Sequence, residues 1–444
     1  MELLVYTTRF SNRLKYTFDL ILKDVIGIQY QFTSKKAEFE KHDGPKLSYG
    51  RNVIGNEIHI GASKLLFEIG VEDQMIEVRD YDGLKGFFPT GKNSQFGFDL
   101  FAASFYLVSR YEEYLPFTAD RFGRFPAKES LAFQNGFLEE PVINLWAQRL
   151  KKILLDKYPD LKVSPRTFHY VPTFDVDSAY AFNYKGVFRI LGGFVRCLID
   201  QDIPQFKQRL RVLLGREKDP YDTFDWILEL QKKYQLNPKF FFLVGDYGEF
   251  DKNIPLTVNE FKYLVKSMAD YAEVGIHPSY ASNDQPEKIK QEIDRLEKAI
   301  NRTVKSSRQH FLKLSLPHTY QQLIEHEIFE DYTMGYASEI GFRASIATPF
   351  YFFDLDYEVQ TKLKVNPFAF MDVALHTYKK YTTEEALERV KAMIHLVKEV
   401  DGTLINVWHN QNLADIESWV GWRDLYEKIT AEAFVVQVTA KYDA

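Results

Sequence analysis

Acidic, imidazole and guanidinium side chains recur at or just after the ends of apolar segments in the second part of the chain. They are Asp175 and Asp177 in TFDVD, Asp246 in FFFLVGD, His277 in EVGIHP, Arg308 and His310 in RQHF, Asp372 in FAFMDVAL, and His409 in TLINVWHN. Carboxylates and imidazoles bind divalent metals and act as general bases and acids. If the apolar segments are strands of one barrel, these groups share a rim and can form a single site. The competing interpretation is that loops at strand ends are polar in most proteins.

The segments that would position these groups alternate between two patterns. After residue 165, short apolar runs rich in Phe, Val and Ile alternate with amphipathic runs of ten to twenty residues, such as TVNEFKYLVKSMADYA, PEKIKQEIDRLEKAI and TEEALERVKAMIHLVKEV. Repeated strand–helix units favour a parallel sheet or barrel, here with seven or eight units. The segment GFRASIA (341–347) is expected to contribute one of the apolar runs.

A domain boundary is predicted near residue 165. Three prolines and mixed charge interrupt the periodic patterns over residues 156–172. Residues 1–165 are expected to form an α+β domain, with strands in ELLVYT, VIGIQYQF and NEIHIGASKLLFEI and helices over 98–115 and 141–158. Their chemistry cannot be assigned from the sequence. Residues 166–444 then form the α/β part.

Composition excludes some partners. The net charge of -6 argues against nucleic acid or an anionic membrane as the main partner. The single cysteine, Cys197, excludes an internal disulfide. No signal sequence and no transmembrane segment is expected, so the expected compartment is the cytoplasm. The oligomeric state is not indicated.

The ordered motifs of residues 165–430 resemble those of the polysaccharide deacetylase family, the family-four carbohydrate esterases. The resemblance implies a distorted (β/α) barrel and a metal-dependent esterase or amidase activity on carbohydrate. TFDVD is similar to the family's TFDDG, in which the first Asp is the catalytic base and the second binds the metal. Asp175 matches the base and Asp177 the ligand, displaced by one residue, and the two roles could be exchanged. The inserted Val176 leaves both carboxylates on one side of an extended segment.

The second and third motifs diverge from the family pattern. HPSYA keeps the first metal-binding histidine as His277 but has Ala281 where the family has the second. In RQHF, Arg308 matches the arginine that braces the base, and His310 replaces a proline. Because catalytic zinc sites need about three protein ligands, our hypothesis is that His310 restores the missing ligand. The alternative is that His310 only accepts or donates a hydrogen bond.

The last motif and the neighbouring polar residues complete the predicted site. His409 matches the family's general acid, with Asp372 as the first choice of acidic partner and Asp331 as the second. The Phe311 N–H is expected to hold the oxyanion. Further substrate-binding residues are expected to be Trp408, Tyr280, Tyr180 and Asp246.

The resemblance therefore predicts a hydrolase that removes an acyl group, most simply N-acetyl, from a carbohydrate with the aid of zinc or a similar divalent metal. Two alternatives stay open. One is a catalytically degenerate barrel that binds a glycan, which the loss of the second histidine favours. The other is hydrolysis of a non-sugar amide C–N bond.

Two further segments have no assigned role. Residues 189–227 form a long, basic, amphipathic insertion after the first motif. A solvated helix face is the default interpretation, and a flap, a subunit contact or a membrane-surface helix are the alternatives. Trp419 and Trp422 are spaced to share a helix face, where core packing is the default and sugar stacking the alternative.

Overall fold

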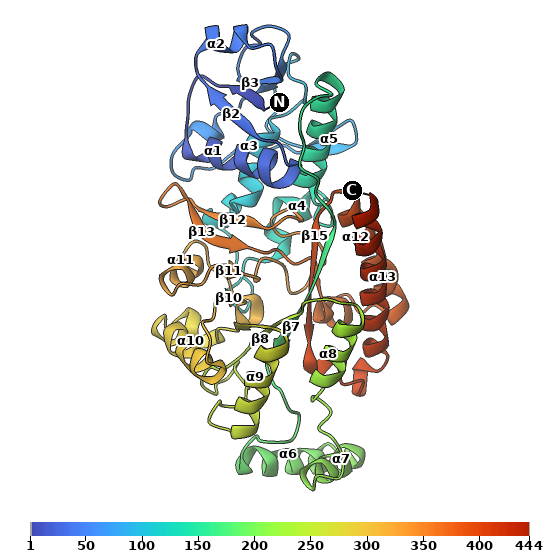
Figure 1. Ribbon diagram of the computed structural model, residues 1–444. Helices are drawn as coiled ribbons and strands as arrows, with labels where there is room; N and C mark the ends of the chain where they lie inside the picture. The colour runs from blue at the N-terminus through green and yellow to red at the C-terminus, as the bar shows by residue number, and fades with distance from the viewer. Residues whose placement is uncertain (1, 444) are drawn as a thin grey trace.

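The computed structural model describes residues 2–443, which contain two main sheets (Figure 1). The smaller sheet has the order β2 (Tyr30–Thr33), β1 (Leu3–Tyr6), β3 (Lys46–Gly50), β4 (Ile58–Gly61), and all its pairs are parallel. It lies at the N-terminal end of the molecule, beside α1 (Asn12–Phe18), α2 (Lys36–Lys41), α3 (Leu100–Val108) and α5 (Val142–Lys157). A short ribbon of β5 (Arg79–Tyr81) and β6 (Leu84–Gly86) completes this part.

Some expected N-terminal strands are shorter than predicted. The apolar run VIGIQYQF begins in a π-helical turn (Asp19–Ile26), and the strand starts only at Tyr30. Gly27 separates the two by adopting a left-handed φ of 91°, which a side chain would disfavour. The expected helix over 98–115 ends at Val108. It begins at Leu100, after the N-cap Asp99, whose carboxylate accepts hydrogen bonds from the amides of Phe101 and Ala102.

The larger sheet contains nine strands and carries the α/β repeats. Its order is β12 (Phe350–Asp354), β13 (Val359–Val365), β11 (Glu330–Asp331), β10 (Ser306–Ser307), β9 (Glu273–Ile276), β8 (Lys239–Phe242), β7 (His169–Val176), β15 (Thr403–His409), β14 (Phe370–Met371). Every pair is parallel except β12 with β13. Its carboxyl ends therefore meet along one edge.

Helices accompany this sheet on its outside (Figure 1). They are α8 (Phe224–Lys233), α9 (Asn259–Tyr271), α10 (Glu287–Ile300), α11 (His318–Glu325), α12 (Thr383–Glu399) and α13 (Trp422–Asp443). In α10 the apolar positions Ile289, Ile293 and Leu296 are all buried, so its apolar stripe faces the core in the usual way. No helix among residues 2–443 is both long and apolar enough to cross a membrane.

The barrel expected from the repeats is open. Among the described residues, the edge strands β12 and β14 have no ladder between them. The segment GFRASIA, expected to supply an apolar run of the repeat, is irregular and belongs to no ladder. Part of it bonds to the N-terminal part: the Phe342 amide donates to the Leu138 carbonyl, and the Ile143 amide donates to the Ser345 carbonyl. Its two ends bond toward the sheet, because the Gly341 amide donates to the Ala369 carbonyl and the Thr403 amide of β15 donates to the Ala347 carbonyl.

The two parts of the chain share one continuous buried cluster. Phe105 of α3 packs against Phe353 of β12 with ring centroids 5.1 Å apart, and Tyr16 of α1 lies at the same distance from Phe353. Buried charged groups also connect the two parts. The Glu113 carboxylate accepts from Arg343 of the second part at 2.9 Å and from Arg110 of its own part at 2.7 Å. The segment over 156–172 therefore connects two parts that pack against each other, and Pro172 lies inside β7.

Candidate metal and active site

Five strands of the larger sheet end beside the predicted site residues. β7 contains Asp175 and ends just before Asp177, β9 ends just before His277, and β10 ends just before Arg308. β14 ends just before Asp372, and β15 ends at His409, which is paired in register with Asp175. Because these strands are parallel, their ends bring the residues to the same edge.

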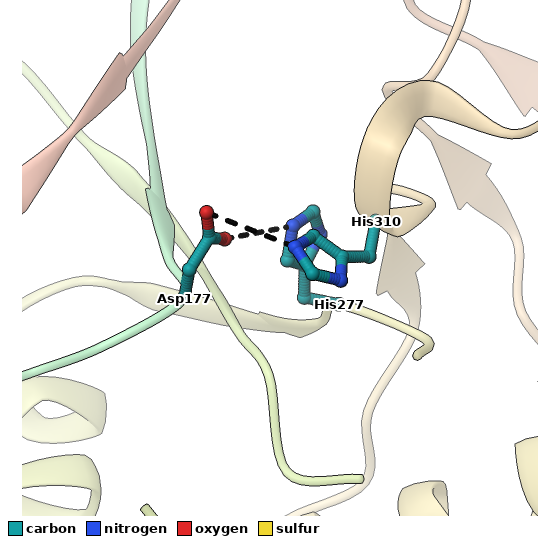
Figure 2. Close-up of side chains that lie close together, drawn as sticks. All are labelled: Asp177, His277 and His310. Atoms are coloured by element: carbon teal, nitrogen blue, oxygen red, sulfur yellow. Dashed lines mark ion pairs between the residues drawn. The ribbon is translucent and has the colours of Figure 1, made fainter. Parts of the chain in front are cut away.

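Asp177, His277 and His310 form a compact group (Figure 2). One ligand atom from each residue lies within 4.8 Å of the other two. The Nε2 atom of His277 is 3.3 Å from Asp177 Oδ1, and the Nε2 atom of His310 is 3.8 Å from Asp177 Oδ2. The hypothesis that His310 supplies the metal ligand in place of the missing second histidine is therefore compatible with the structure.

Each histidine of this group has its other ring nitrogen held by an acceptor. His277 Nδ1 is 2.6 Å from the Arg308 carbonyl oxygen, and His310 Nδ1 is 2.8 Å from Asp251 Oδ1. A carbonyl can only accept, so Nδ1 of His277 carries the proton and Nε2 is left as a lone-pair donor. Such outer partners fix the tautomer of metal-binding histidines in general. Both imidazoles thus present Nε2 toward Asp177.

Asp177 has the character of an unsatisfied ligand. Its Oδ1 atom is buried and has no hydrogen-bond partner among the described residues. Burial raises the pKa of Asp177, but the charge of His310 and the closeness of both imidazoles outweigh it and bring that pKa well below the usual range. A carboxylate with a buried oxygen that lacks a partner, beside two oriented imidazoles, fits the donor set of a divalent cation such as zinc.

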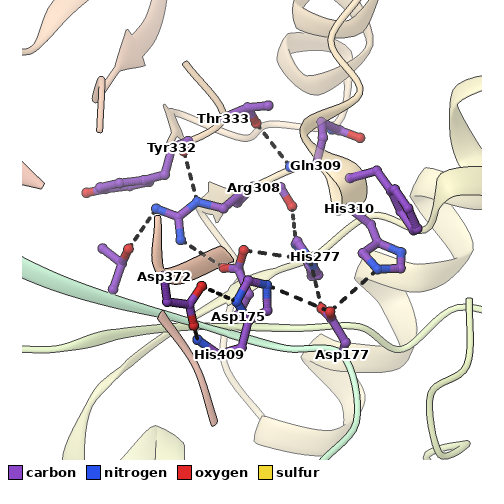
Figure 3. A network of polar contacts seen from close by, with 12 residues as sticks. Asp175, Asp177, His277, Arg308, Gln309, His310, Tyr332, Thr333, Asp372 and His409 are labelled. Atoms are coloured by element: carbon purple, nitrogen blue, oxygen red, sulfur yellow. Dashed lines mark hydrogen bonds and ion pairs between the residues drawn. The ribbon is translucent and has the colours of Figure 1, made fainter. Parts of the chain in front are cut away.

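Asp175 is held separately from this group by Arg308 (Figure 3). Arg308 is fully buried and donates from Nη1 to Asp175 Oδ1 at 2.8 Å. Its other donors reach the Tyr332 carbonyl at 2.9 Å and the Thr173 hydroxyl at 2.7 Å. The second Asp175 oxygen lies 3.9 Å from His277 Nε2. Asp175 is thus oriented by a fixed cation, while Asp177 points at the histidines.

His409 is paired with Asp372, the first-choice partner. Asp372 Oδ1 lies 2.8 Å from His409 Nδ1, and Asp372 Oδ2 accepts the His409 amide at 2.8 Å and the Asn412 side chain at 2.9 Å. Burial lowers the pKa of His409, but the Asp372 carboxylate outweighs it and raises that pKa to about 10. The alternative partner Asp331 accepts from Ser307, Tyr320 and Thr333 instead.

A cleft of about 260 Å³ is lined by Asp175, Asp177, His277, His310 and His409. Its walls include residues that the sequence did not single out: Arg121, Phe122, Arg124, Gln309, Leu312, Ala337, Met371, Val373 and Tyr378. The first three come from the N-terminal part. Arg124 donates to the Phe311 carbonyl at 2.8 Å and to Asp120 at 2.8 Å, which fixes this loop against the site.

Three of the predicted substrate residues lie away from the cleft. Trp408 is fully buried and packs on Tyr426, because successive residues of β15 face opposite sides and His409 takes the cleft side. Tyr180 is buried against Tyr184. Asp246 lies four residues beyond β8 and pairs with Arg295 at 2.8 Å.

Tyr280 is close to the cleft without lining it. Its hydroxyl donates to the Phe122 carbonyl at 3.2 Å, and its ring packs on Phe311 with centroids 5.5 Å apart. It therefore supports two lining residues from behind. Phe311 itself lines the cleft with a left-handed φ of 59°.

Asp251 and Thr173 are the polar partners that the sequence reasoning missed. Asp251 accepts from His310 and from the Tyr280 amide, and its loop carries no motif that would mark it. Thr173 lies two residues before Asp175 on β7, so the alternation of the strand places it on the same side and could have identified it.

Comparisons with known proteins give one matching family model and several similar solved structures. The model of a family of unknown function, DUF7033, matches residues 3–159. A comparison with the curated proteins found no match. Among solved structures, the chain is similar to a Mycobacterium smegmatis protein assigned as a polysaccharide deacetylase, with 13% identity, TM-score 0.40, and coverage of 61% of this chain and 85% of that one.

Two further similar structures are of proteins named as family 4 carbohydrate esterases (CE4) or their pseudoenzymes. A CE4 family pseudoenzyme from Bacillus anthracis is 12% identical, with TM-score 0.31 and coverage of 61% and 63%. A family 4 carbohydrate esterase from Streptomyces lividans, in complex with acetate, is 10% identical, with TM-score 0.29 and coverage of 63% and 91%. These are proteins of the kind that the motifs resemble. At TM-scores below 0.5, the roles of individual residues rest on the geometry of this chain.

Proposed function

We propose that the protein is a metal-dependent hydrolase that removes an acetyl group from an N-acetylated carbohydrate. The observation that carries the proposal is the arrangement of three groups of residues around one cleft. These are the Asp177/His277/His310 ligand group, the Asp175–Arg308 pair and the His409–Asp372 pair. Residues 1–165 form, in this proposal, an N-terminal domain that packs on the catalytic part and completes the cleft.

The ligand group would hold one divalent cation, with zinc the best fit to a carboxylate and two imidazoles. Such a cation, when bound, supplies Lewis acidity that polarises the acyl carbonyl and lowers the pKa of water. The structure offers Asp177 as the anionic ligand because its Oδ1 atom is buried without a partner. Asp251 and the Arg308 carbonyl keep the two imidazoles in the ligating orientation.

The remaining residues would handle the protons. Asp175, oriented by the Arg308 guanidinium, takes the proton of the attacking water. The Phe311 amide donates to the oxyanion of the tetrahedral intermediate. His409, protonated at neutral pH because Asp372 raises its pKa, gives its proton to the leaving amine. The carbon–nitrogen bond breaks in this step, and acetate and the free amino sugar are released.

Acetate release from a panel of N-acetylated sugars, with added zinc, tests this function. We expect Asp175→Asn to lower kcat by about 10²-fold or more, since it removes the general base. Asp246→Asn is the matched control: it also follows a strand end, but it pairs with Arg295 and does not line the cleft. Wild-type protein that releases no acetate from any sugar, or an Asp175→Asn variant as active as Asp246→Asn, would refute the proposal.

A further inference from the structure

The insertion after the first motif folds into two helices that expose apolar side chains. α6 (Val187–Ile199) and α7 (Ile203–Leu213) lie together at the end of the molecule opposite the N-terminal sheet (Figure 1). Cys197 is the only buried residue of α6, and Val212 is the only buried residue of α7. In α10 of the same chain the apolar positions are buried instead.

The exposed apolar residues form a stripe on each helix. On α6 they are Val187, Phe188, Leu191, Val195, Leu198 and Ile199, and on α7 with its end they are Ile203, Leu210 and Leu214. The spacing of three or four residues along α6 places its set on one face. Phe188 is 91% exposed and Ile199 is 74% exposed. We call these nine residues the apolar face.

The inner side of the hairpin is anchored by polar and aromatic contacts. Phe194 packs on Phe206 with centroids 4.9 Å apart, and Gln205 donates to Glu417 at 3.0 Å. Arg189 donates to the carbonyls of Asn253 and Lys252 at 3.1 and 2.8 Å. The apolar face is therefore the side that the rest of the chain leaves without a partner.

The charge of the two helices indicates what would bind the apolar face. Residues 185–216 contain seven Lys or Arg and two Asp, whereas the whole chain has a net charge of -6. Lys207 and Arg216 are exposed and have no ion-pair partner among the described residues. An apolar helix face that also carries unpaired basic residues fits the interface of an anionic bilayer, where acyl chains take the apolar side chains and headgroups take the cations. Two copies of this basic surface would repel each other, which disfavours self-association.

We propose that α6 and α7 dock the protein on the surface of a membrane that contains anionic lipid. The helices would lie in the interface plane without crossing it. The docking surface is also linked to the site: Arg189 binds the loop at Lys252 and Asn253, and the preceding Asp251 accepts from His310. This inference does not depend on the proposed function.

Vesicle flotation of the full-length protein tests the docking. We expect wild type to float with vesicles of phosphatidylcholine mixed with phosphatidylglycerol, and about tenfold less with phosphatidylcholine alone. The variant Phe188→Ser/Leu191→Ser/Ile199→Ser should lose about tenfold or more of the bound fraction. The matched control Ile69→Ser/Met75→Ser alters two equally exposed apolar residues elsewhere and should float like wild type.

A second variant keeps the test decisive if the triple variant does not fold. Lys207→Gln/Arg216→Gln should weaken flotation and reduce its dependence on salt, because it removes only the headgroup contacts. Wild type that stays unbound to anionic vesicles would overturn the proposal. A triple variant that floats like wild type would also overturn it. So would light scattering that shows a wild-type dimer, absent in the triple variant, together with no flotation of wild type.

Discussion

At the scale of single residues, the site depends on which nitrogen of each histidine is free. His277, His310 and His409 all have Nδ1 engaged by an oxygen and direct Nε2 toward Asp177. In the proposed reaction, His277 and His310 bind the metal through that nitrogen, whereas His409 donates a proton from it. Nε2 of His409 lies 3.8 Å from Asp177 Oδ2 and lines the cleft, where the proposed reaction needs an acid.

The Asp372→Asn variant tests this division at His409. The Asp372 carboxylate outweighs burial and raises the pKa of His409 to about 10, so its loss should lower that pKa. Since the general acid must be protonated, activity falls as pH rises through its pKa, and the alkaline limb of the kcat profile should move to lower pH. Asp331→Asn is the control, because that buried carboxylate does not contact His409. An unmoved limb in Asp372→Asn would count against His409 as the acid.

At the scale of elements, very short strands position the site because their neighbours fix them. β10 and β14 have two residues each, yet they place Arg308 and Asp372. The irregular segment after β11 is fixed by charge rather than by a ladder. Arg343 and Arg110 both donate to the Glu113 carboxylate, and Arg110 also donates to the Arg343 carbonyl. Both arginines are almost fully buried.

Glu113→Ala should therefore destabilise the fold strongly. It would leave the buried Arg343 guanidinium without its carboxylate and Arg110 with Glu112 alone, and breaking a buried pair in this way costs about 3–5 kcal/mol in comparable cases. Glu77→Ala, which removes an exposed partner of Arg79, should hardly change the free energy of unfolding. Urea unfolding of both variants measures the difference. Equal, small effects would show that the Arg110/Glu113/Arg343 cluster does not secure this segment.

At the scale of the whole molecule, the N-terminal part contributes to the cleft. Its loop at residues 120–124 supplies Arg121, Phe122 and Arg124, and Arg124 ties the loop to the Phe311 carbonyl. Arg121 is exposed, lies over the Phe122 ring and has no ion-pair partner among residues 2–443. A free guanidinium at the cleft wall can bind an anionic or polar group of a substrate.

Arg121→Ala should accordingly raise KM by about tenfold for a substrate with a carboxylate or phosphate, because a hydrogen bond to a charged group is lost. The value of kcat and the metal content should not change, since Arg121 does not touch the ligand group. Lys128→Ala alters an exposed cation of the same region outside the cleft and is the control. Steady-state kinetics with the sugar found in the acetate-release panel would decide, and an unchanged KM would contradict this role.

The sequence predicted the strand ends better than the contacts made across loops. Periodicity and chain order are local, so Asp175, His277, Arg308 and His409 could be placed beside the ends of β7, β9, β10 and β15. Asp251 and Arg121 reach the site from loops whose position depends on the packing of the whole molecule. Trp408 was misplaced because adjacency to His409 was given more weight than the alternation of the strand.

The proposed metal site is tested most directly by the metal content of the purified protein. It would be measured by mass spectrometry for wild type, His277→Ala and His310→Ala. We expect about one equivalent of zinc or a similar cation in wild type and its loss in both variants, because each removes one of the three proposed ligands. His318→Ala should keep the metal, since His318 lies on α11 and bonds to Gln322. Wild type that binds no cation even when supplied with zinc, or a His310→Ala variant that retains it fully, would contradict the account.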